Sequence, residues 1–176
     1  MSWQSRLFGL DYRLSTRLRV AEKPGLLRSL AILLAHSGDS WFWLLGLGLL
    51  WWLGDSFWRG SALALLAGIL VTAAAVMLIK FTVRRRRPEG EWGKIYRNTD
   101  PHSFPSGHAA RAVMLAVLAV GLGPGWFGLL LGVWAPLVVL ARVAMGLHYL
   151  SDVLAGALFG LVMGGIILRL LPAFPF

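Results

Sequence analysis

The chain has 176 residues, of which 57% are hydrophobic and 14% charged, and its mean hydropathy is +0.69. Soluble domains carry about 25% charged residues, so a soluble domain of this size could not bury so much apolar surface. The net charge of +9 suits nucleic acid, anionic lipid or an anionic substrate, but the hydropathy disfavours nucleic acid. Because the chain has no cysteine, it forms neither a disulfide framework nor a thiolate metal site.

Residues 1–25 are predicted to be an N-terminal amphipathic segment. Between residues 3 and 20, apolar residues recur at spacings of three and four: Trp3, Leu7, Leu10, Leu14 and Leu18. This spacing is one face of a helix, and a helix with arginines on its other faces is typical of a membrane surface. A frayed polar tail is the alternative. No continuous apolar run indicates a cleavable signal peptide in residues 1–24.

Residues 26–176 are predicted to form one membrane-embedded domain, an all-α polytopic bundle of transmembrane helices. A spanning helix needs about 20 apolar residues. Five stretches approach that length: 26–53, 61–79, 107–122, 126–140 and 154–171. The first is interrupted by His36-Ser-Gly-Asp39-Ser, so it is one tilted span or a short interfacial helix followed by another helix. The chain therefore has five spans, or six if residues 26–53 cross the membrane twice.

Five spans would place the N-terminus, residues 81–105 and residues 142–152 on one face of the membrane. That face carries six N-terminal cations, namely Arg6, Arg13, Arg17, Arg19, Lys23 and Arg28. The opposite face has Arg59 and Arg169. The positive-inside rule then predicts an integral protein of the inner or plasma membrane whose polar motifs face the cytoplasm. Six spans would invert this orientation.

The first polar motif runs from Lys80 to Pro88. Lys80 and Arg87 are seven residues apart, so on a continuing helix they point the same way, and Pro88 then ends that helix. An ammonium and a guanidinium bind phosphate in complementary ways. The alternative is a positive-inside flank, which is the interpretation we give to Arg84, Arg85 and Arg86.

The second motif is Pro105-Ser106-Gly107-His108, directly before an apolar helix. Ser106 is placed to cap that helix, and Gly107 leaves its backbone N–H accessible to an anion. His108 in the first turn could give a proton to a leaving oxygen. An ordinary helix cap with an incidental histidine is the alternative.

The third motif comprises Arg142, His148 and Asp152. His148 and Asp152 are four residues apart and share a helix face. A carboxylate bonded to one imidazole nitrogen makes the other nitrogen the better nucleophile. Arg142 ends an apolar stretch, where a charge is costly unless it faces partners. A structural His–Asp pair beside an interfacial arginine would have the same pattern.

Together the three motifs offer the parts that phosphoryl transfer needs, which are cations, a nucleophile and a proton donor. Their spacing closely resembles the type 2 phosphatidic acid phosphatase superfamily, whose signature is Lys-x6-Arg-Pro, Pro-Ser-Gly-His and Ser-Arg-x5-His-x3-Asp. The first two parts are complete here, and the third has Ala141 in place of serine. The lost hydroxyl leads us to expect weaker phosphate binding or a changed substrate preference.

The resemblance implies a membrane lipid phosphatase that needs no metal and no cofactor. It implies that His148 attacks phosphorus, that Asp152 orients it and that His108 protonates the leaving group. The phosphoryl oxygens would be held by Lys80, Arg87, Ser106, Gly107 and Arg142.

The implied partners are a bilayer and a lipid phosphate such as phosphatidate, phosphatidylglycerol phosphate or a polyprenyl phosphate or diphosphate. Candidate selectivity residues in the 89–104 loop are Glu89, Glu91, Lys94, Arg97 and His102. The competing functions are a catalytically weak lipid-binding scaffold or carrier, a haloperoxidase, and a transporter using His36 and Asp39. His36 and Asp39 are more simply interpreted as caps at a helix break. The sequence does not indicate an oligomeric state.

Overall fold

The computed structural model of the protein describes residues 3–90, 92 and 94–171. These residues form helices and connecting loops without a strand, apart from one isolated bridge between Arg86 and His102. The helices are α1 (Trp3–Arg17), α2 (Leu26–Ser37), α3 (Ser40–Leu53), α4 (Ser56–Val83), α5 (Lys94–Thr99), α6 (Gly107–Leu122), α7 (Gly125–Ala144) and α8 (Leu150–Leu170). The all-α class predicted from the sequence is confirmed for the described part of the chain.

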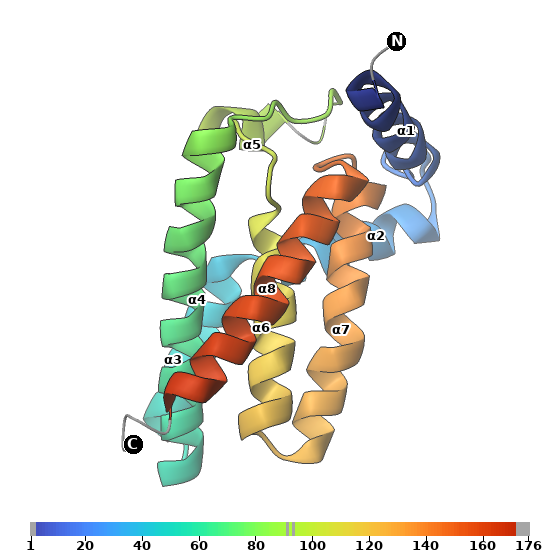
Figure 1. Ribbon diagram of the computed structural model, residues 1–176. Helices are drawn as coiled ribbons and strands as arrows, with labels where there is room; N and C mark the ends of the chain where they lie inside the picture. The colour runs from blue at the N-terminus through green and yellow to red at the C-terminus, as the bar shows by residue number, and fades with distance from the viewer. Residues whose placement is uncertain (1–2, 91, 93, 172–176) are drawn as a thin grey trace.

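Helix α6 lies at the centre of the bundle, in contact with α4, α7 and α8 (Figure 1). Its core side chains are small or medium in size and buried, including Ala109, Ala112, Leu115 and Leu118. Helix α3 packs on α4 and α2 packs on α7. Because its neighbours surround it, α6 faces protein rather than lipid along most of its length.

Helices α6 and α8 cross at very short range because α8 presents glycines to α6. A Cβ at Gly156 would overlap the carbonyl oxygen of Ser106, and one at Gly160 would overlap that of Ala110. Small residues allow membrane helices to approach this closely. The contact at Gly156 also fixes the start of α8 against the residues that begin α6.

Among the described residues, three helices are long and apolar enough to cross a membrane, namely α4, α7 and α8. Helices α2 and α3 pass the same test as a pair bent by 58°, which makes a fourth candidate. Helix α6 has 16 residues, or about 24 Å at 1.5 Å per residue, and is shorter than the roughly 30 Å hydrocarbon layer. The prediction of five or six spans is therefore not confirmed, because length and composition alone support three or four.

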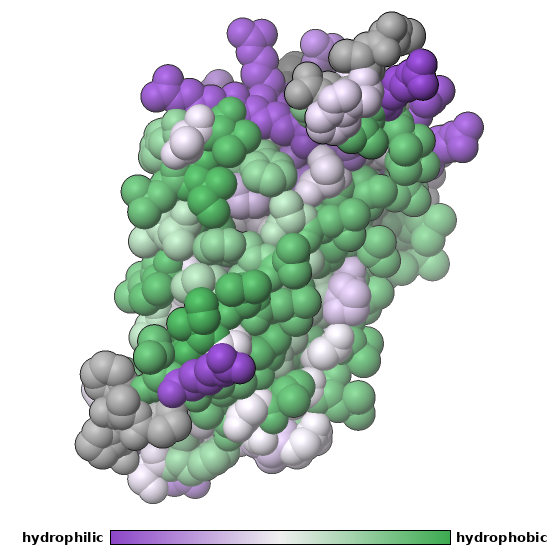
Figure 2. All heavy atoms as spheres, viewed as in Figure 1, coloured by the Kyte–Doolittle hydropathy of each residue, from purple (hydrophilic) through white to green (hydrophobic). Residues whose placement is uncertain are grey.

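The polar side chains gather at one end of the molecule, and an apolar surface covers most of the rest (Figure 2). Exposed large hydrophobic residues occur along every candidate span, among them Leu70, Leu78, Leu129 and Leu158. This distribution is that of an integral membrane protein, since lipid replaces the missing protein core. The N-terminal helix and α5 lie at the polar end, and helix α8 ends at the other end (Figure 1).

Helix α1 forms at the predicted place and leaves Trp3, Leu7 and Leu14 exposed. It is attached to the bundle at the start of α8. The Ser15 hydroxyl accepts from the backbone N–H of Leu150 at 2.8 Å, and Asp11 accepts from that of Ser151 at 3.0 Å. A position on the membrane surface and a division of the chain at residue 25 stay predictions.

Candidate active site

The predicted site residues come together at the polar end of the bundle, on six separate parts of the fold. Lys80 is in the last turn of α4, Arg87 follows α4, and Ser106, Gly107 and His108 begin α6. Arg142 ends α7, His148 lies in the α7–α8 turn, and Asp152 is in the first turn of α8. Gly146 in that turn has a φ of 64°, a left-handed conformation that suits glycine and reverses the chain.

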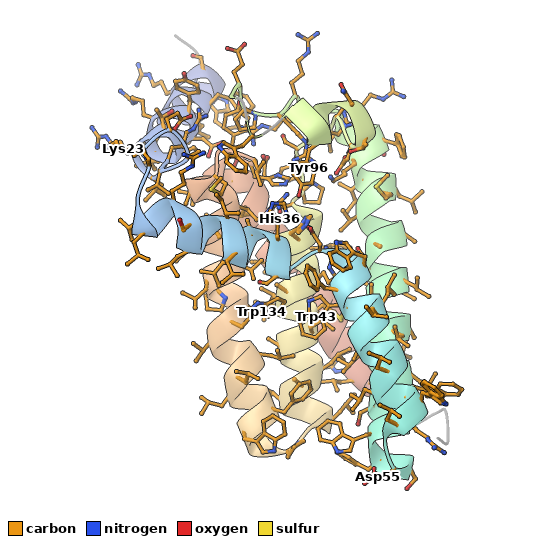
Figure 3. All side chains as sticks on the ribbon, turned by 180° about the vertical axis from the view of Figure 1, so that it is seen from behind. Lys23, His36, Trp43, Asp55, Tyr96 and Trp134 are labelled. Atoms are coloured by element: carbon orange, nitrogen blue, oxygen red, sulfur yellow. The ribbon has the colours of Figure 1, made fainter. Side chains whose placement is uncertain are left out.

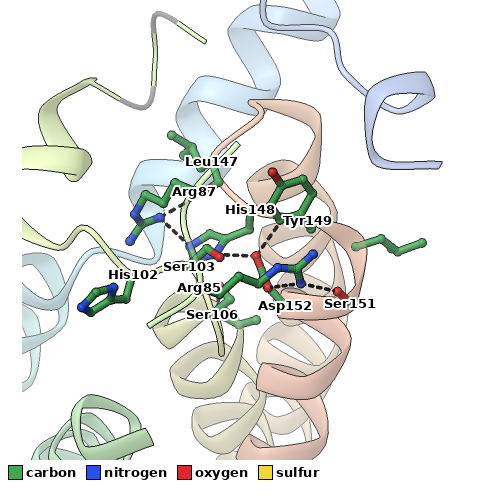
Figure 4. A network of polar contacts seen from close by, with 12 residues as sticks. Arg85, Arg87, His102, Ser103, Ser106, Leu147, His148, Tyr149, Ser151 and Asp152 are labelled. Atoms are coloured by element: carbon green, nitrogen blue, oxygen red, sulfur yellow. Dashed lines mark hydrogen bonds and ion pairs between the residues drawn. The ribbon is translucent and has the colours of Figure 1, made fainter. Parts of the chain in front are cut away.

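His148 and Asp152 face each other as their spacing predicts. Nδ1 of His148 lies 3.6 Å from Oδ2 of Asp152, and Nε2 lies 3.1 Å from Nη1 of Arg87 (Figure 4). Burial lowers the pKa of His148 to about 3, against an opposing effect of the Asp152 carboxylate. The imidazole is therefore neutral at physiological pH, and Nε2, which accepts from Arg87, is the nitrogen whose lone pair can act as the nucleophile.

Asp152 is held in place by a network that sequence analysis missed. Arg85 donates to Oδ1 of Asp152 at 2.7 Å and to the hydroxyl of Ser151 at 2.6 Å (Figure 4). The other Arg85 amino group donates to Asp11 of α1 at 2.7 Å. The interpretation of Arg85 as a membrane flank is thus wrong, because its guanidinium points inward while Arg84 and Arg86 are exposed.

Lys80 and Arg87 are brought together around Asp100, a second residue that the sequence motifs did not indicate. Nη2 of Arg87 lies 2.7 Å from Oδ2 of Asp100, and Nζ of Lys80 contacts the same oxygen. Burial lowers the pKa of Arg87, and the Asp100 carboxylate opposes that effect. The two cations are therefore close enough to neutralise one dianion together.

Arg142 is fully buried and has unused donors. Its Nη1 contacts the carbonyl oxygen of Ala35 at 3.3 Å and the hydroxyl of Tyr96 at 3.5 Å. Its Nε and Nη2 have no hydrogen-bond partner among the described residues. A buried guanidinium with two unpaired donors is costly unless an anion completes it, so this is the chemistry of a phosphate-binding group.

The second motif joins the site through the start of α6. The Ser106 hydroxyl accepts from the backbone N–H of Ala109 at 3.4 Å, which confirms the predicted cap. Ser106 also donates its own N–H to the carbonyl oxygen of Asp152 at 3.0 Å, linking the second and third motifs. Nε2 of His108 lies 2.6 Å from Oδ1 of Asp39.

Asp39 occupies the N-cap position of α3, as predicted for this break, but its side chain makes no capping hydrogen bond to that helix. Ala141 is buried in an apolar cluster with Ala31, Ala35 and Met145. Of the predicted selectivity residues, Glu89 is exposed, and His102 accepts from Lys80 through its backbone oxygen at 3.0 Å. Glu91 and the side chains of Lys94 and Arg97 lie outside the described residues.

The PAP2 superfamily model matches residues 61–175, which contain all three motifs. The chain belongs to the PAP2 superfamily. A decaprenylphosphoryl-5-phosphoribose phosphatase of Mycobacterium tuberculosis is 34% identical over 152 residues, covering 84% of this chain and 82% of that protein. Phosphatidylglycerophosphatase B of Haemophilus influenzae is 38% identical over 85 residues, covering 43% of this chain and 35% of that protein.

Solved PAP2 structures share the fold. The crystal structure of Aquifex aeolicus LpxE superposes with a TM-score of 0.73 at 25% identity, covering 91% of this chain and 95% of that one. A transmembrane PAP2-type phosphatidylglycerolphosphate phosphatase from Bacillus subtilis has a TM-score of 0.78 at 22% identity, covering 97% and 88%. The chain is thus a membrane phosphatase of the PAP2 type, as its motifs predicted.

Proposed function

We propose that the protein hydrolyses the phosphate monoester or diphosphate of a lipid through a phosphohistidine formed on His148. The observation that carries this proposal is the contact between Nε2 of the neutral, buried His148 and the Arg87 guanidinium. A nucleophile placed beside cations meets the phosphoryl group where the developing charge is neutralised. The unpaired donors of Arg142 supply further neutralisation.

In the first step, Nε2 of His148 attacks phosphorus while the bond from phosphorus to the leaving oxygen breaks. The electron pair of that bond stays on the leaving oxygen, which takes a proton from His108. The Asp152 carboxylate, whose Oδ2 lies 3.6 Å from Nδ1 of His148, stabilises the charge that forms on the ring. The phosphoryl oxygens are held by Lys80, Arg87, Arg142, Ser106 and the N–H of Gly107.

In the second step, water attacks the phosphohistidine. The neutral His108 accepts a proton from that water, the bond from nitrogen to phosphorus breaks, and its electron pair returns to Nε2 of His148. Inorganic phosphate is released and His108 is again protonated. We propose that neither step uses a metal or a cofactor, so activity should survive excess EDTA.

A cavity beside the site suits a lipid tail. Its volume is about 610 Å³, and Lys80, Tyr96, Asp100 and His108 lie in its wall. Its apolar lining comes from α3 and α4, including Trp41, Ile69, Val76 and Met77. We propose that the acyl or prenyl chain lies between α3 and α4 while the phosphate reaches His148.

The relatives suggest which lipids to test first. Two of them are named for a decaprenylphosphoryl phosphoribose and for phosphatidylglycerophosphate, both of which are phosphate esters on a lipid. Phosphatidate and polyprenyl phosphates or diphosphates complete the panel. The short α5 loop gives little surface for reading a headgroup, so we expect the tail and the phosphate to dominate recognition.

We further propose five crossings, made by the bent α2–α3 pair and by α4, α6, α7 and α8, with the active site at the cytoplasmic face. Exposed cations on the polar end, among them Arg6, Arg13 and Arg17, support this orientation. Because the native chain lacks cysteine, labelling of a single introduced cysteine reports directly on which side of the membrane that position lies. An impermeant maleimide applied to intact cells should label Asp55→Cys and spare Lys23→Cys, and the reverse pattern contradicts the orientation.

The enzymatic test is phosphate release from the lipid panel by detergent-purified protein in excess EDTA. Wild type should release phosphate from at least one lipid, and His148→Ala should release none. Arg142→Ala should lower kcat/KM by about 100-fold or more, because the two charged hydrogen bonds from the buried guanidinium to the phosphoryl oxygens are lost. Arg59→Ala at the opposite end is the matched control. Equal activity of wild type and His148→Ala would exclude the phosphohistidine route.

A further inference from the structure

The break between α2 and α3 carries a carboxylate that faces the proposed general acid. Asp39 sits at this break, and its Oδ1 lies 2.6 Å from Nε2 of His108. Its other oxygen, Oδ2, lies 3.1 Å from Nδ1 of His36. One carboxylate thus joins two imidazoles from helices that are about 70 residues apart in the chain.

The break is fixed against α6 by the guanidinium of Arg111, which follows His108 by one helical turn. Nε of Arg111 donates to the carbonyl oxygen of Gly38 at 3.0 Å, and Nη1 contacts the hydroxyl of Ser40. A Cβ at Gly38 would lie 3.4 Å from Cδ2 of His108, so the backbone itself packs on the ring. The two residues that flank Asp39 are therefore anchored to the helix that carries His108.

Asp39 and His108 lie in the wall of the proposed lipid cavity, and His36 lies in the same wall and is more exposed than either. The side chains of His36, Asp39 and His108 are 46%, 19% and 16% exposed. Figure 3 shows His36 at the end of α2, on the same side of the bundle as Tyr96. The His108 ring meets Tyr96 edge-on with ring centroids 6.2 Å apart, and the positive charges of Arg142 and Arg111 act on His108.

We infer that Asp39 is the positioning residue of the general acid His108, so that the site contains a second His–Asp pair besides His148 and Asp152. The inference rests on the proposed phosphatase function. A carboxylate only accepts hydrogen bonds, so Nε2 of His108 is the nitrogen that donates to Asp39. The proton that moves during the reaction is therefore carried by Nδ1.

The proton balance follows from this assignment. In the first step, Nδ1 of the imidazolium gives its proton to the leaving oxygen, and the ring becomes neutral with its remaining proton on Nε2. In the second step, Nδ1 takes a proton from the attacking water. Asp39 stays ionised throughout, and it favours the imidazolium between turnovers as a triad carboxylate does.

The test compares two leaving groups in the full-length protein in detergent. Octyl phosphate loses a basic alkoxide that needs protonation, whereas p-nitrophenyl phosphate loses a stable phenolate that does not. The value of kcat/KM reports only the steps through leaving-group departure. Asp39→Asn should lower kcat/KM for octyl phosphate by about 10- to 100-fold, because the variant loses part of the rate enhancement that the general acid provides. For p-nitrophenyl phosphate, kcat/KM should fall by less than about threefold.

Asp55→Asn is the matched control because Asp55 also begins a helix but lies at the opposite end of the bundle (Figure 3). Its kcat/KM should be unchanged for both esters. A loss of equal size for both esters in Asp39→Asn, or no loss for either, overturns the inference while the phosphatase activity stands. If wild type hydrolyses neither these esters nor any lipid phosphate, the proposed function itself fails.

The tautomer of His108 gives a second test on wild-type protein, which holds even if Asp39→Asn does not fold. Nitrogen-15 NMR of the labelled protein, with the His108 signals assigned by their loss in His108→Gln, should show the neutral ring protonated on Nε2. A proton on Nδ1 instead would overturn the inference.

Discussion

Arg85 gives the sharpest mutational test of the site, because its sequence context made it look like one of three equivalent membrane-flanking arginines. Its guanidinium instead bonds Asp152 at 2.7 Å, Ser151 at 2.6 Å and Asp11 at 2.7 Å. Only the bond to Asp152 bears directly on the nucleophile, because Asp152 is the residue that faces His148. Replacing Arg85 with glutamine should therefore release the carboxylate that orients the imidazole.

The size of the effect follows from one charged hydrogen bond. Such a bond contributes about 1.5–3 kcal/mol, and the 20% exposure of the Arg85 side chain lets water replace part of it. We take about 1.5–2 kcal/mol, which corresponds to a 10- to 30-fold lower kcat/KM for Arg85→Gln. Arg85→Lys keeps the charge but cannot bridge three partners, so it should lie between wild type and Arg85→Gln.

The assay is phosphate release from the preferred lipid, measured well below the melting temperature of each variant. Arg84→Gln and Arg86→Gln are matched controls, because both side chains are exposed and each removes one positive charge from the same segment. Both should stay within about twofold of wild type, as surface substitutions usually do. An Arg85→Gln enzyme as active as these two neighbours would refute the supporting role of the network.

Three further predictions follow from the packing and charges. Gly160→Ala should lower the free energy of unfolding by about 2 kcal/mol, since its Cβ would overlap the Ala110 carbonyl, whereas Gly165→Ala has open space and should cost nothing in a detergent melting assay. Because the pKa of His148 is about 3 when folded and about 6.5 when unfolded, the unfolded chain binds more protons between these values. Stability should therefore fall as pH drops through this window, by up to about 1.4 kcal/mol per unit from this group, and His148→Gln should show a shallower slope in melting curves. Asp11→Asn should weaken the attachment of α1 to α8, seen as faster proteolysis of the N-terminal helix with a smaller loss of activity than Arg85→Gln.

The sequence predicted the helices best where a local signal marked an end. The apolar stretch 107–122 coincides with α6 because Ser106 caps its start and Gly123 follows its end. Helix α4 extends beyond the predicted 61–79 to Ser56–Val83, since Asp55 caps it from outside the apolar stretch. Local composition could not predict whether α6 crosses the membrane. A helix this short can lie at membrane depth only where neighbouring helices bury it, and that burial is known only from the folded structure.

The motif residues were predictable because their spacing repeats a known pattern, whereas their supporting residues were not. Arg85 reaches Asp152 across 67 residues, and His108 reaches Asp39 across 69. Asp100 joins Arg87 from a loop without a motif of its own. Single polar residues that meet only in the folded chain carry no periodic signal, so only the structure reveals that they belong to the site.

The most direct measurement of the central claim is rapid-quench capture of the covalent intermediate. Wild-type protein mixed with a lipid carrying phosphorus-32 and quenched in alkali should hold label that is stable to base and labile to acid. The label should map to the peptide that contains His148 and be absent from His148→Ala. Turnover by wild type without any protein-bound label at His148, at every time from mixing to steady state, would contradict the phosphohistidine route.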